Sequence, residues 1–476
     1  MRLSDYVAKE ISKHTEYVFM VTGGGAMNLN DAFSKNRDIS VVCCHHEQAC
    51  SIAAEGYSRI SGKIGAINVT TGPGGINALN GVFGAWVDSI PMIVISGQVK
   101  RETMMSQYNL QGKLRQLGDQ EADIVTIVNS ITKYSKVITD PMNIRYEVEK
   151  AIFLAKNGRP GPCWIDIPGD IQGMDVNPDE LKSFNPAIDE IKINDNVISN
   201  VLSKLINSKR PVIYAGSGIW LSKTHDKFIK FIDKLNIPVV TAWNSNDLLW
   251  NDHKCYAGRP GSVGDRAGNF SVQNSDCLLV LGCRLNIRLI SYDWKKFAPN
   301  SYKIGVDIDE NELNKPTLDY NEKIVADLND FFEISLKILD KNNIEFKNDS
   351  NWKETTKNWL KKYPIVLDKY WKKSSPVNPY CFIDKLFENL NEDNIIVTSD
   401  GTACVTAFQA ATIKKGQRIF LEAAKVAPSC ALTSTAVTTL IRSLSSRQLM
   451  ICLPHQPRPI TAAFSICKFP DFMECV

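Results

Sequence analysis

The sequence lacks the features that identify several classes of protein. It contains no run of about 18 apolar residues, so no membrane-spanning helix is predicted. Residues 1–6 lack the apolar core of a secretory signal peptide. The 13 cysteines form no CxxC pair and the histidines no cluster at metal-ligand spacing, which disfavours a structural zinc site or a disulfide framework. The net charge of only +3 gives no indication of a nucleic-acid partner. Together, these absences lead us to expect a soluble cytoplasmic protein with no membrane partner.

Length and patterning predict the fold class. A chain of 476 residues allows roughly three domains at about 150 residues each. Strand and helix signals alternate, which favours parallel sheets covered on both faces. We predict an α/β protein with three doubly wound parallel-sheet domains, the third incomplete. The predicted segments are residues 1–175, 190–340, 375–420 and an aberrant tail at 421–476.

Two features of the first segment suggest a ligand site. Glu47 follows an apolar run at residues 39–43, so it is predicted at the carboxyl end of a strand, where α/β folds bind ligands. Taken alone, it also fits a solvated carboxylate in the first turn of a helix. Residues 71–75 (TGPGG) follow the next predicted strand and can bring backbone close to a planar or anionic ligand, although a plain tight turn fits equally well. The two features, one strand–helix unit apart, are more specific than either alone.

Longer segments extend this pattern into a family resemblance. The chain resembles the thiamine diphosphate enzymes, and acetolactate synthase large subunits in particular. The resemblance covers about residues 1–420 and is carried by HHEQAC, AAEGYSRISGK, TGPGGINALNGVFGAWVDSIPMIVISGQV, NGRPGPCWIDIPGDIQ and VQNSDCLLVLGCRL. It implies a pyrimidine-binding domain at residues 1–175, a central domain at 190–340 and the start of a diphosphate-binding domain at 375–420.

The resemblance also implies roles for individual residues. Glu47 matches the glutamate that hydrogen-bonds a ring nitrogen of the cofactor's aminopyrimidine, and Gln120 matches a glutamine that faces the reacting group; these are the predicted catalytic residues. The residues predicted to bind the cofactor are Gly23, Gly72, Pro73, Gly74 and Asn77 beside the pyrimidine, and Thr402 and Ala403 near the diphosphate.

The implied activity is thiamine diphosphate-dependent decarboxylation and carboligation of 2-oxo acids such as pyruvate. In this family Mg²⁺ bridges the diphosphate to the protein, and acetolactate synthases also hold FAD in the central domain. Residues 216–218 (GSG) fit such a flavin or a plain strand–helix turn. The family site forms between the first domain of one subunit and the third domain of another, so the resemblance implies a homodimer or homotetramer.

The sequence departs from the family near the predicted site. Asp119 stands where the family has an aromatic residue beside the reacting carbonyl, which suggests a different or more polar substrate. Residues 22–25 (TGGG) lack the proline common at that place, and Thr402 with Ala403 replaces a Gln-His pair.

The largest departure is the tail, residues 421–476. The family's Gly-Asp-Gly motif and later asparagine, which hold Mg²⁺, are missing, so we predict no metal ligand in this chain; residues 399–401 (SDG) come too early in the domain. One hypothesis is a frameshift near Phe420, because codons for residues 425–428 can be read two bases later as Gly-Cys-Ala, the tripeptide expected there; resequencing the locus tests it. A diverged tail is the alternative. The chain is therefore either an impaired enzyme or a non-catalytic, truncated homologue that pairs with a full-length subunit.

Overall fold

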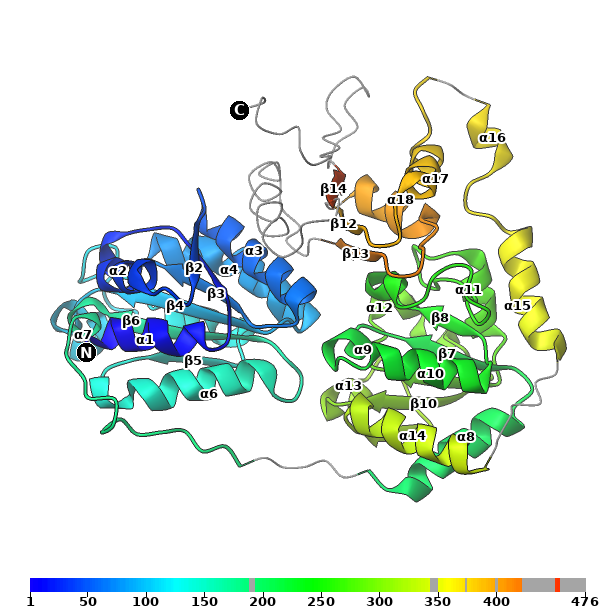
Figure 1. Cartoon of the computed structure of the whole chain (residues 1–476), viewed down its shortest axis with the longest axis horizontal. Coiled ribbons are helices and arrows are strands. Elements are labelled where there is room, and N and C mark those ends of the chain that lie inside the picture. Colours follow the sequence, from blue (N-terminus) through cyan, green and yellow to red (C-terminus); the bar gives the residue numbers. More distant parts are fainter. Residues whose placement is uncertain (188–192, 343–349, 373–374, 399–400, 422–449, 454–476) are drawn as a thin grey trace. The chain divides into compact units, whose positions relative to one another are not determined.

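The computed structural model describes residues 1–187, 193–342, 350–372, 375–398, 401–421 and 450–453 (Figure 1). The chain divides into two compact units, and each is treated by itself. Of the described residues, the first unit contains 1–187 and the second contains the remainder. Within these ranges, none of the helices combines the length and apolar character that crossing a bilayer requires.

The first unit is built on a six-stranded sheet with strand order β2-β1-β3-β4-β6-β5, in which all neighbours are parallel. The central strands β3, β4 and β6 are buried along their whole length, as expected for a sheet covered on both faces. The strands are β1 (Tyr17–Met20), β2 (Ser40–Cys43), β3 (Gly65–Val69), β4 (Met92–Gln98), β5 (Tyr134–Val137) and β6 (Pro162–Pro168).

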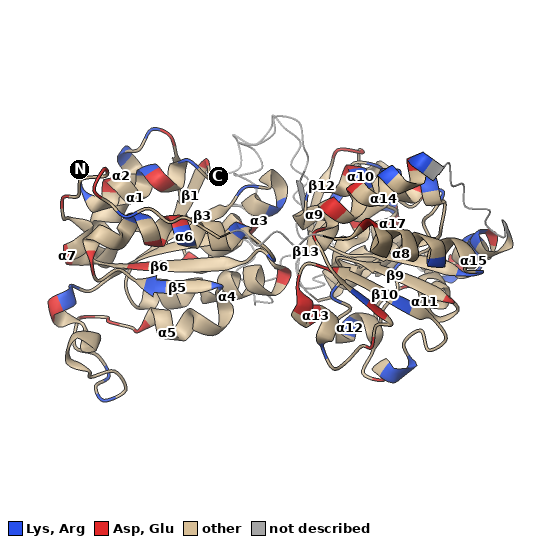
Figure 2. Cartoon of the chain, turned by 90° about the horizontal axis from the view of Figure 1, so that it is seen from below, with Lys and Arg blue, Asp and Glu red and all other residues tan. Residues whose placement is uncertain are grey.

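Helices cover both faces of this sheet. In Figure 2, α1, α2 and α6 lie on one side of β6, and α4 and α5 lie on the other. The first group contributes Leu3, Val7, Leu29, Phe33 and Val148 to one apolar core. The main helices are α1 (Leu3–Ser12), α2 (Met27–Lys35), α3 (Glu47–Ser61), α4 (Pro73–Asp88), α5 (Ile124–Val128), α6 (Ile144–Lys156) and α7 (Gly169–Gln172).

Helix α4 begins earlier than the sequence pattern suggests. The sequence fits a plain tight turn at residues 71–75, whereas the helix already starts at Pro73. Proline is favoured at the first helical position because its fixed φ suits the helix and its missing N–H would have no partner there. Gly74 and Gly75 therefore belong to the first turn of a 16-residue helix, and Gly72 is its N-cap residue.

The second unit contains a five-stranded parallel sheet with strand order β11-β10-β9-β7-β8. Its strands are β7 (Pro211–Ala215), β8 (Val239–Thr241), β9 (Cys277–Leu281), β10 (Tyr302–Asp307) and β11 (Glu322–Val325). Helices α8 (Asp195–Asn207), α10 (His225–Leu235) and α14 (Leu328–Asn342) contribute to the core on one face. The shorter helices are α9 (Gly218–Leu221), α11 (Arg266–Gln273), α12 (Ile287–Ile290) and α13 (Glu310–Asn314).

The same unit carries a small third sheet with strand order β13-β12-β14, also parallel. Its strands are β12 (Ile395–Thr398), β13 (Arg418–Leu421) and β14 (Met450–Leu453), and the nearby helices are α15 (Ser350–Lys362), α16 (Asp368–Trp371), α17 (Pro379–Asn389) and α18 (Thr402–Ala410). Strand β14 lies within the predicted tail, for which the sequence predicts no sustained periodicity. Four residues are enough to form this strand because the backbone of β12 pairs with it along its whole length.

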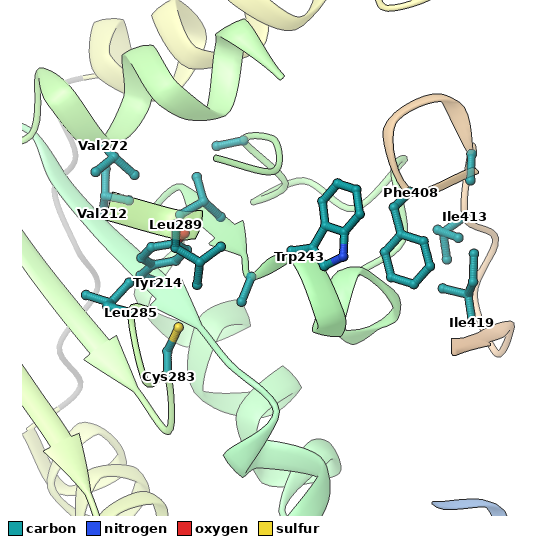
Figure 3. Close-up of a cluster of buried hydrophobic side chains, with 14 of the residues drawn as sticks. Val212, Tyr214, Trp243, Val272, Cys283, Leu285, Leu289, Phe408, Ile413 and Ile419 are labelled. Atoms are coloured by element: carbon teal, nitrogen blue, oxygen red, sulfur yellow. The ribbon is translucent and has the colours of Figure 1, made fainter. Parts of the chain in front are cut away.

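One apolar cluster joins the two sheets of the second unit (Figure 3). Trp243 and Phe408 stack with ring centroids 5.2 Å apart and an interplanar angle of 18°. Tyr214 lies on the side of the five-stranded sheet, and Ile413 and Ile419 lie on the side of the small sheet. The small sheet therefore shares a core with the five-stranded sheet.

Buried polar contacts reinforce this junction. Arg259 is 4% exposed and its guanidinium donates to the carbonyls of Ala411 (2.9 Å) and Phe408 (3.3 Å), which close the end of α18. The same guanidinium donates to the side chain of Asn251 at 2.8 Å. Asn251 in turn pairs with the backbone of Ile413 in both directions.

The predicted fold class is confirmed: the sheets are parallel, helices cover them, and the third sheet is small and incomplete. The predicted domain boundaries at residues 175, 190, 340, 375 and 420 remain predictions.

The Arg259→Met variant tests the junction. We expect the free energy of unfolding to fall by about 2–3 kcal/mol, because two buried carbonyls lose their donor. Urea denaturation followed by circular dichroism measures the loss. Arg266→Met, which removes an exposed arginine from α11, is the control. Equal stability of the two variants would contradict the structural role of Arg259.

Candidate functional site

The predicted site residues of the first unit gather where the parallel strands end. Gly23 follows β1, Glu47 follows β2 and Gly72 follows β3. Because all strands of this sheet are parallel, their carboxyl ends lie along one edge, which we call the carboxyl edge. Ligands of open α/β sheets bind at such edges.

Glu47 is the first residue of α3 and is only 8% exposed. His46 caps this helix by accepting a hydrogen bond at Nδ1 from the backbone N–H of Gln48 (3.2 Å). The Asn77 amide, one turn into α4, donates to Glu47 Oε2 at 3.0 Å. Among the described residues, no Lys or Arg side chain forms an ion pair with Glu47 within 4.0 Å. A buried carboxylate without a cationic partner is suited to accept a proton or hydrogen bond from a ligand.

Gly74 allows this carboxylate to approach α4. A Cβ atom at Gly74 would lie 3.3 Å from Glu47 Oε1 and 2.8 Å from Thr70 Cγ2. A side chain at this position would crowd both groups. The structure thus brings together Glu47, Gly74 and Asn77, which the sequence separates by about 30 residues.

Gly72 and Gln120 are also neighbours. Gly72 has φ +58°, and a Cβ atom there would lie 2.0 Å from the backbone carbonyl oxygen of Gln120. Gln120 itself has φ +59°, a left-handed conformation that is strained for a residue with a side chain. Pro73 is exposed at the start of α4, and Gln120 is exposed as well.

Gly23 contacts the same region from β1. A Cβ atom at Gly23 would lie 2.5 Å from Thr70 Cβ, and the N–H of Gly25 donates to Thr70 Oγ1 at 3.1 Å. The glycine run therefore packs against the end of β3. This close approach accounts for glycine at residues 23 and 25, whereas a Cβ atom at Gly24 would meet nothing within 4 Å.

Thr402 and Ala403 lie in the second unit, as the first two residues of α18. They follow β12 and Gly401, which has φ +76°. The free N–H groups at the start of a helix fit an anion. Of the residues 399–401, Ser399 and Asp400 lie outside the described residues, and so do the suggested frameshift segment, residues 425–428, and the tail apart from Leu421 and residues 450–453.

Packing accounts for the glycines at residues 216–218. A Cβ atom at Gly216 would lie 2.3 Å from the carbonyl oxygen of Gly282, and one at Gly218 would lie 2.7 Å from Gly282 Cα. The turn after β7 thus needs glycine to approach the turn after β9. Within the described ranges, no three His, Cys, Asp or Glu side chains gather in a way that could hold a metal ion.

The sequence did not point to a buried polar network beneath the carboxyl edge. Asp166 on β6 is fully buried; Ser96 Oγ donates to its Oδ1, and Gln98 Nε2 donates to its Oδ2 at 2.9 Å. The indole of Trp164 donates to Ser96 Oγ at 2.7 Å. Burial raises the pKa of Asp166 to about 7, and the charge of Asp123 adds to the rise. In the sequence, this network could have been found from Gln98 and Asp166, which lie near the ends of two apolar strands.

Two family models match parts of the chain. The family model described as "Thiamine pyrophosphate enzyme, N-terminal TPP binding domain" matches residues 1–122, and the one described as "Thiamine pyrophosphate enzyme, central domain" matches residues 198–334.

Curated relatives are similar over most of the chain. The acetolactate synthase large subunit of Lactococcus lactis is 34% identical over 390 residues, which cover 81% of this chain and 64% of the relative. That of Buchnera aphidicola (from Acyrthosiphon pisum) is 32% identical, with 82% of this chain and 66% of the relative covered. The acetolactate synthase isozyme 3 large subunit of Escherichia coli is 29% identical, with the same coverage. The chain spans slightly less than two thirds of the length of these relatives.

The Gly72→Ala variant tests the contact with Gln120. We expect a loss of about 2–4 kcal/mol in unfolding free energy, because alanine adds both left-handed strain and a clash with the carbonyl. Gly112→Ala is the matched control: Gly112 has φ +72° but open space around its Cβ position. For this control, left-handed backbone strain alone should lower the unfolding free energy by about 1–2 kcal/mol. Urea denaturation measures both, and equal losses would contradict the contact.

Asp166 predicts a pH dependence of stability. Unfolded aspartate titrates at about pH 4, so between about pH 4 and pH 7 the folded protein keeps a proton that the unfolded chain releases. The unfolding free energy should therefore fall as pH rises through this range and level off above it. Relative to Asp166→Asn, which does not titrate, we expect a fall of about 2–4 kcal/mol. Urea denaturation at several pH values measures it, and a constant difference between the two proteins would contradict the raised pKa.

Proposed function

Because the chain belongs to the thiamine pyrophosphate enzymes, as its two domain matches show, we propose that it takes part in thiamine diphosphate-dependent decarboxylation and carboligation of 2-oxo acids. The acetolactate synthase large subunits among its relatives support this choice of reaction.

The observation that carries the proposal is the cluster of Glu47, Gly74 and Asn77. The buried Glu47 carboxylate can accept a hydrogen bond from a ring nitrogen of the cofactor's aminopyrimidine. Asn77 fixes the carboxylate by donating to Oε2, which leaves Oε1 beside the gap that Gly74 provides. The residues present therefore fit a flat heterocycle.

The chain's own groups would bind, orient and exchange a proton. When bound, thiamine diphosphate supplies the carbanion chemistry that no side chain provides. Glu47 would hold a proton at the pyrimidine ring, and Gly74 would let the ring approach the backbone. Gln120, at the carboxyl edge, would orient the 2-oxo acid. Asp119, which is exposed, favours a more polar substrate than pyruvate.

The family resemblance assigns the diphosphate end of the cofactor to Thr402 and Ala403. The start of α18, with Thr402 and Ala403, offers backbone N–H groups to an anion. The described residues contribute no acidic cluster that would hold Mg²⁺. FAD remains a further proposed cofactor that only the resemblance supports, since the close contact with Gly282 already explains Gly216 and Gly218.

We also propose that the working unit is a homodimer or homotetramer. Helix α4 exposes large apolar side chains at Ile76 (46%), Phe83 (52%) and Trp86 (38%). Exposed apolar residues on one helix suggest a surface that a second subunit covers.

A second candidate is a non-catalytic homologue that pairs with a full-length subunit. The missing metal motif in residues 421–476 favours it. Such a chain would still offer Glu47 to a partner.

The Glu47→Gln variant tests the proposed chemistry. With thiamine diphosphate and Mg²⁺ bound, we expect exchange of the cofactor's C2 proton, followed by NMR, to slow by at least about 100-fold, because an amide cannot transfer the proton. Glu102→Gln, an exposed carboxylate of the same unit, should exchange like the wild type. Equal rates in all three proteins would contradict the role of Glu47. If calorimetry detects no cofactor binding to the wild type, the second candidate is favoured.

A further inference from the structure

The segment before α5 has a backbone path that needs explanation. Residues 117–122 are here called the Gln120 loop. Leu117, Asp119 and Gln120 are exposed, and Gln120 adopts φ +59°. An exposed residue of this type would normally relax to negative φ. Contacts elsewhere must therefore hold it.

Glu121 holds the loop from one side. Its Oε2 accepts hydrogen bonds from the backbone N–H groups of Leu117 (3.2 Å) and Gly118 (3.1 Å). Its Oε1 accepts from the N–H of Met105 at 2.7 Å. Three backbone donors thus converge on one carboxylate and join the loop to residue 105. Charge-assisted hydrogen bonds of this kind are stronger than neutral ones.

Gln98 holds the loop from below. Its Nε2 donates to the carbonyl of Ala122 and to Asp166 Oδ2, both at 2.9 Å, while its Oε1 accepts from the N–H of Val99 at 3.0 Å. Asp166 Oδ2 accepts whether or not the carboxyl is protonated at Oδ1. The buried acid therefore fixes the orientation of the amide, so that one N–H points at Ala122.

Resting on the proposed function, we propose that Glu121 and Gln98 are positioning residues that hold Gln120 at the carboxyl edge, with its carbonyl against Gly72. They touch neither the cofactor nor the substrate in this account. Their hydrogen bonds bracket Gln120, at residues 117–118 on one side and at residue 122 on the other. The fixed carbonyl explains why residue 72 must be glycine.

Hydrogen exchange on the cofactor-free full chain tests the inference directly. In Glu121→Gln the side chain keeps only one accepting oxygen. The backbone N–H groups that lose their acceptor, either that of Met105 or those of Leu117 and Gly118, should therefore exchange about tenfold faster. Gln98→Met removes the acceptor of the Val99 N–H, which should exchange about tenfold faster. Circular dichroism checks that both variants fold, and either variant alone suffices if the other does not.

Matched controls come from the same unit. Glu102→Gln and Gln107→Met alter exposed side chains of similar size and chemistry and should leave these amides unchanged. If exchange in Glu121→Gln and Gln98→Met equals that in the controls, the inference is overturned.

A second readout separates the inference from the proposed function. If the wild type binds thiamine diphosphate and converts pyruvate, the two variants should lower kcat about tenfold while cofactor affinity changes less than about twofold. An unchanged kcat would overturn the positioning role. If the wild type binds no cofactor, the proposed function fails, whereas the exchange data still decide whether Glu121 and Gln98 fix the loop.

Discussion

The close approach of α4 to its surroundings at Gly72 and Gly74 is the constraint on which the candidate site depends. At Gly74 the helix comes near enough for the Glu47 carboxylate to sit against its backbone, and at Gly72 the carbonyl of Gln120 occupies the space of a side chain. Pro73 starts the helix between the two glycines, which fixes its first turn. Small changes in this turn would move both predicted catalytic residues at once.

Burial gives the site its chemical character. Glu47 lies buried at the carboxyl edge and accepts a hydrogen bond from the Asn77 amide. Asp166 lies beneath the edge, and its pKa is raised. Desolvation favours the protonated form of Asp166, which fixes the neighbouring donors Ser96 and Gln98. The two carboxyl groups have different surroundings: Glu47 faces the predicted ligand, whereas Asp166 faces Ser96 and Gln98.

In the second unit, the main feature is the packing of one sheet against the other. A shared apolar core and the buried Arg259 join the five-stranded sheet to the small third sheet and α18. The third sheet can thus form against an existing surface, although its described part has only three strands. The start of α18 presents the first-turn backbone N–H groups of a helix, the kind of donor that binds anions.

The sequence alone determined the parallel α/β architecture and the pairing of Glu47 with the glycine segment, because alternating apolar runs and glycines at strand ends are local signals. The family resemblance added the roles of Gln120 and Asn77. Only the tertiary structure decided that Asn77 donates to Glu47, that the Gln120 carbonyl requires Gly72, and that Glu121 and Gln98 converge on one loop. These contacts join residues that lie far apart in the chain or depend on backbone angles, and neither composition nor periodicity encodes such distances.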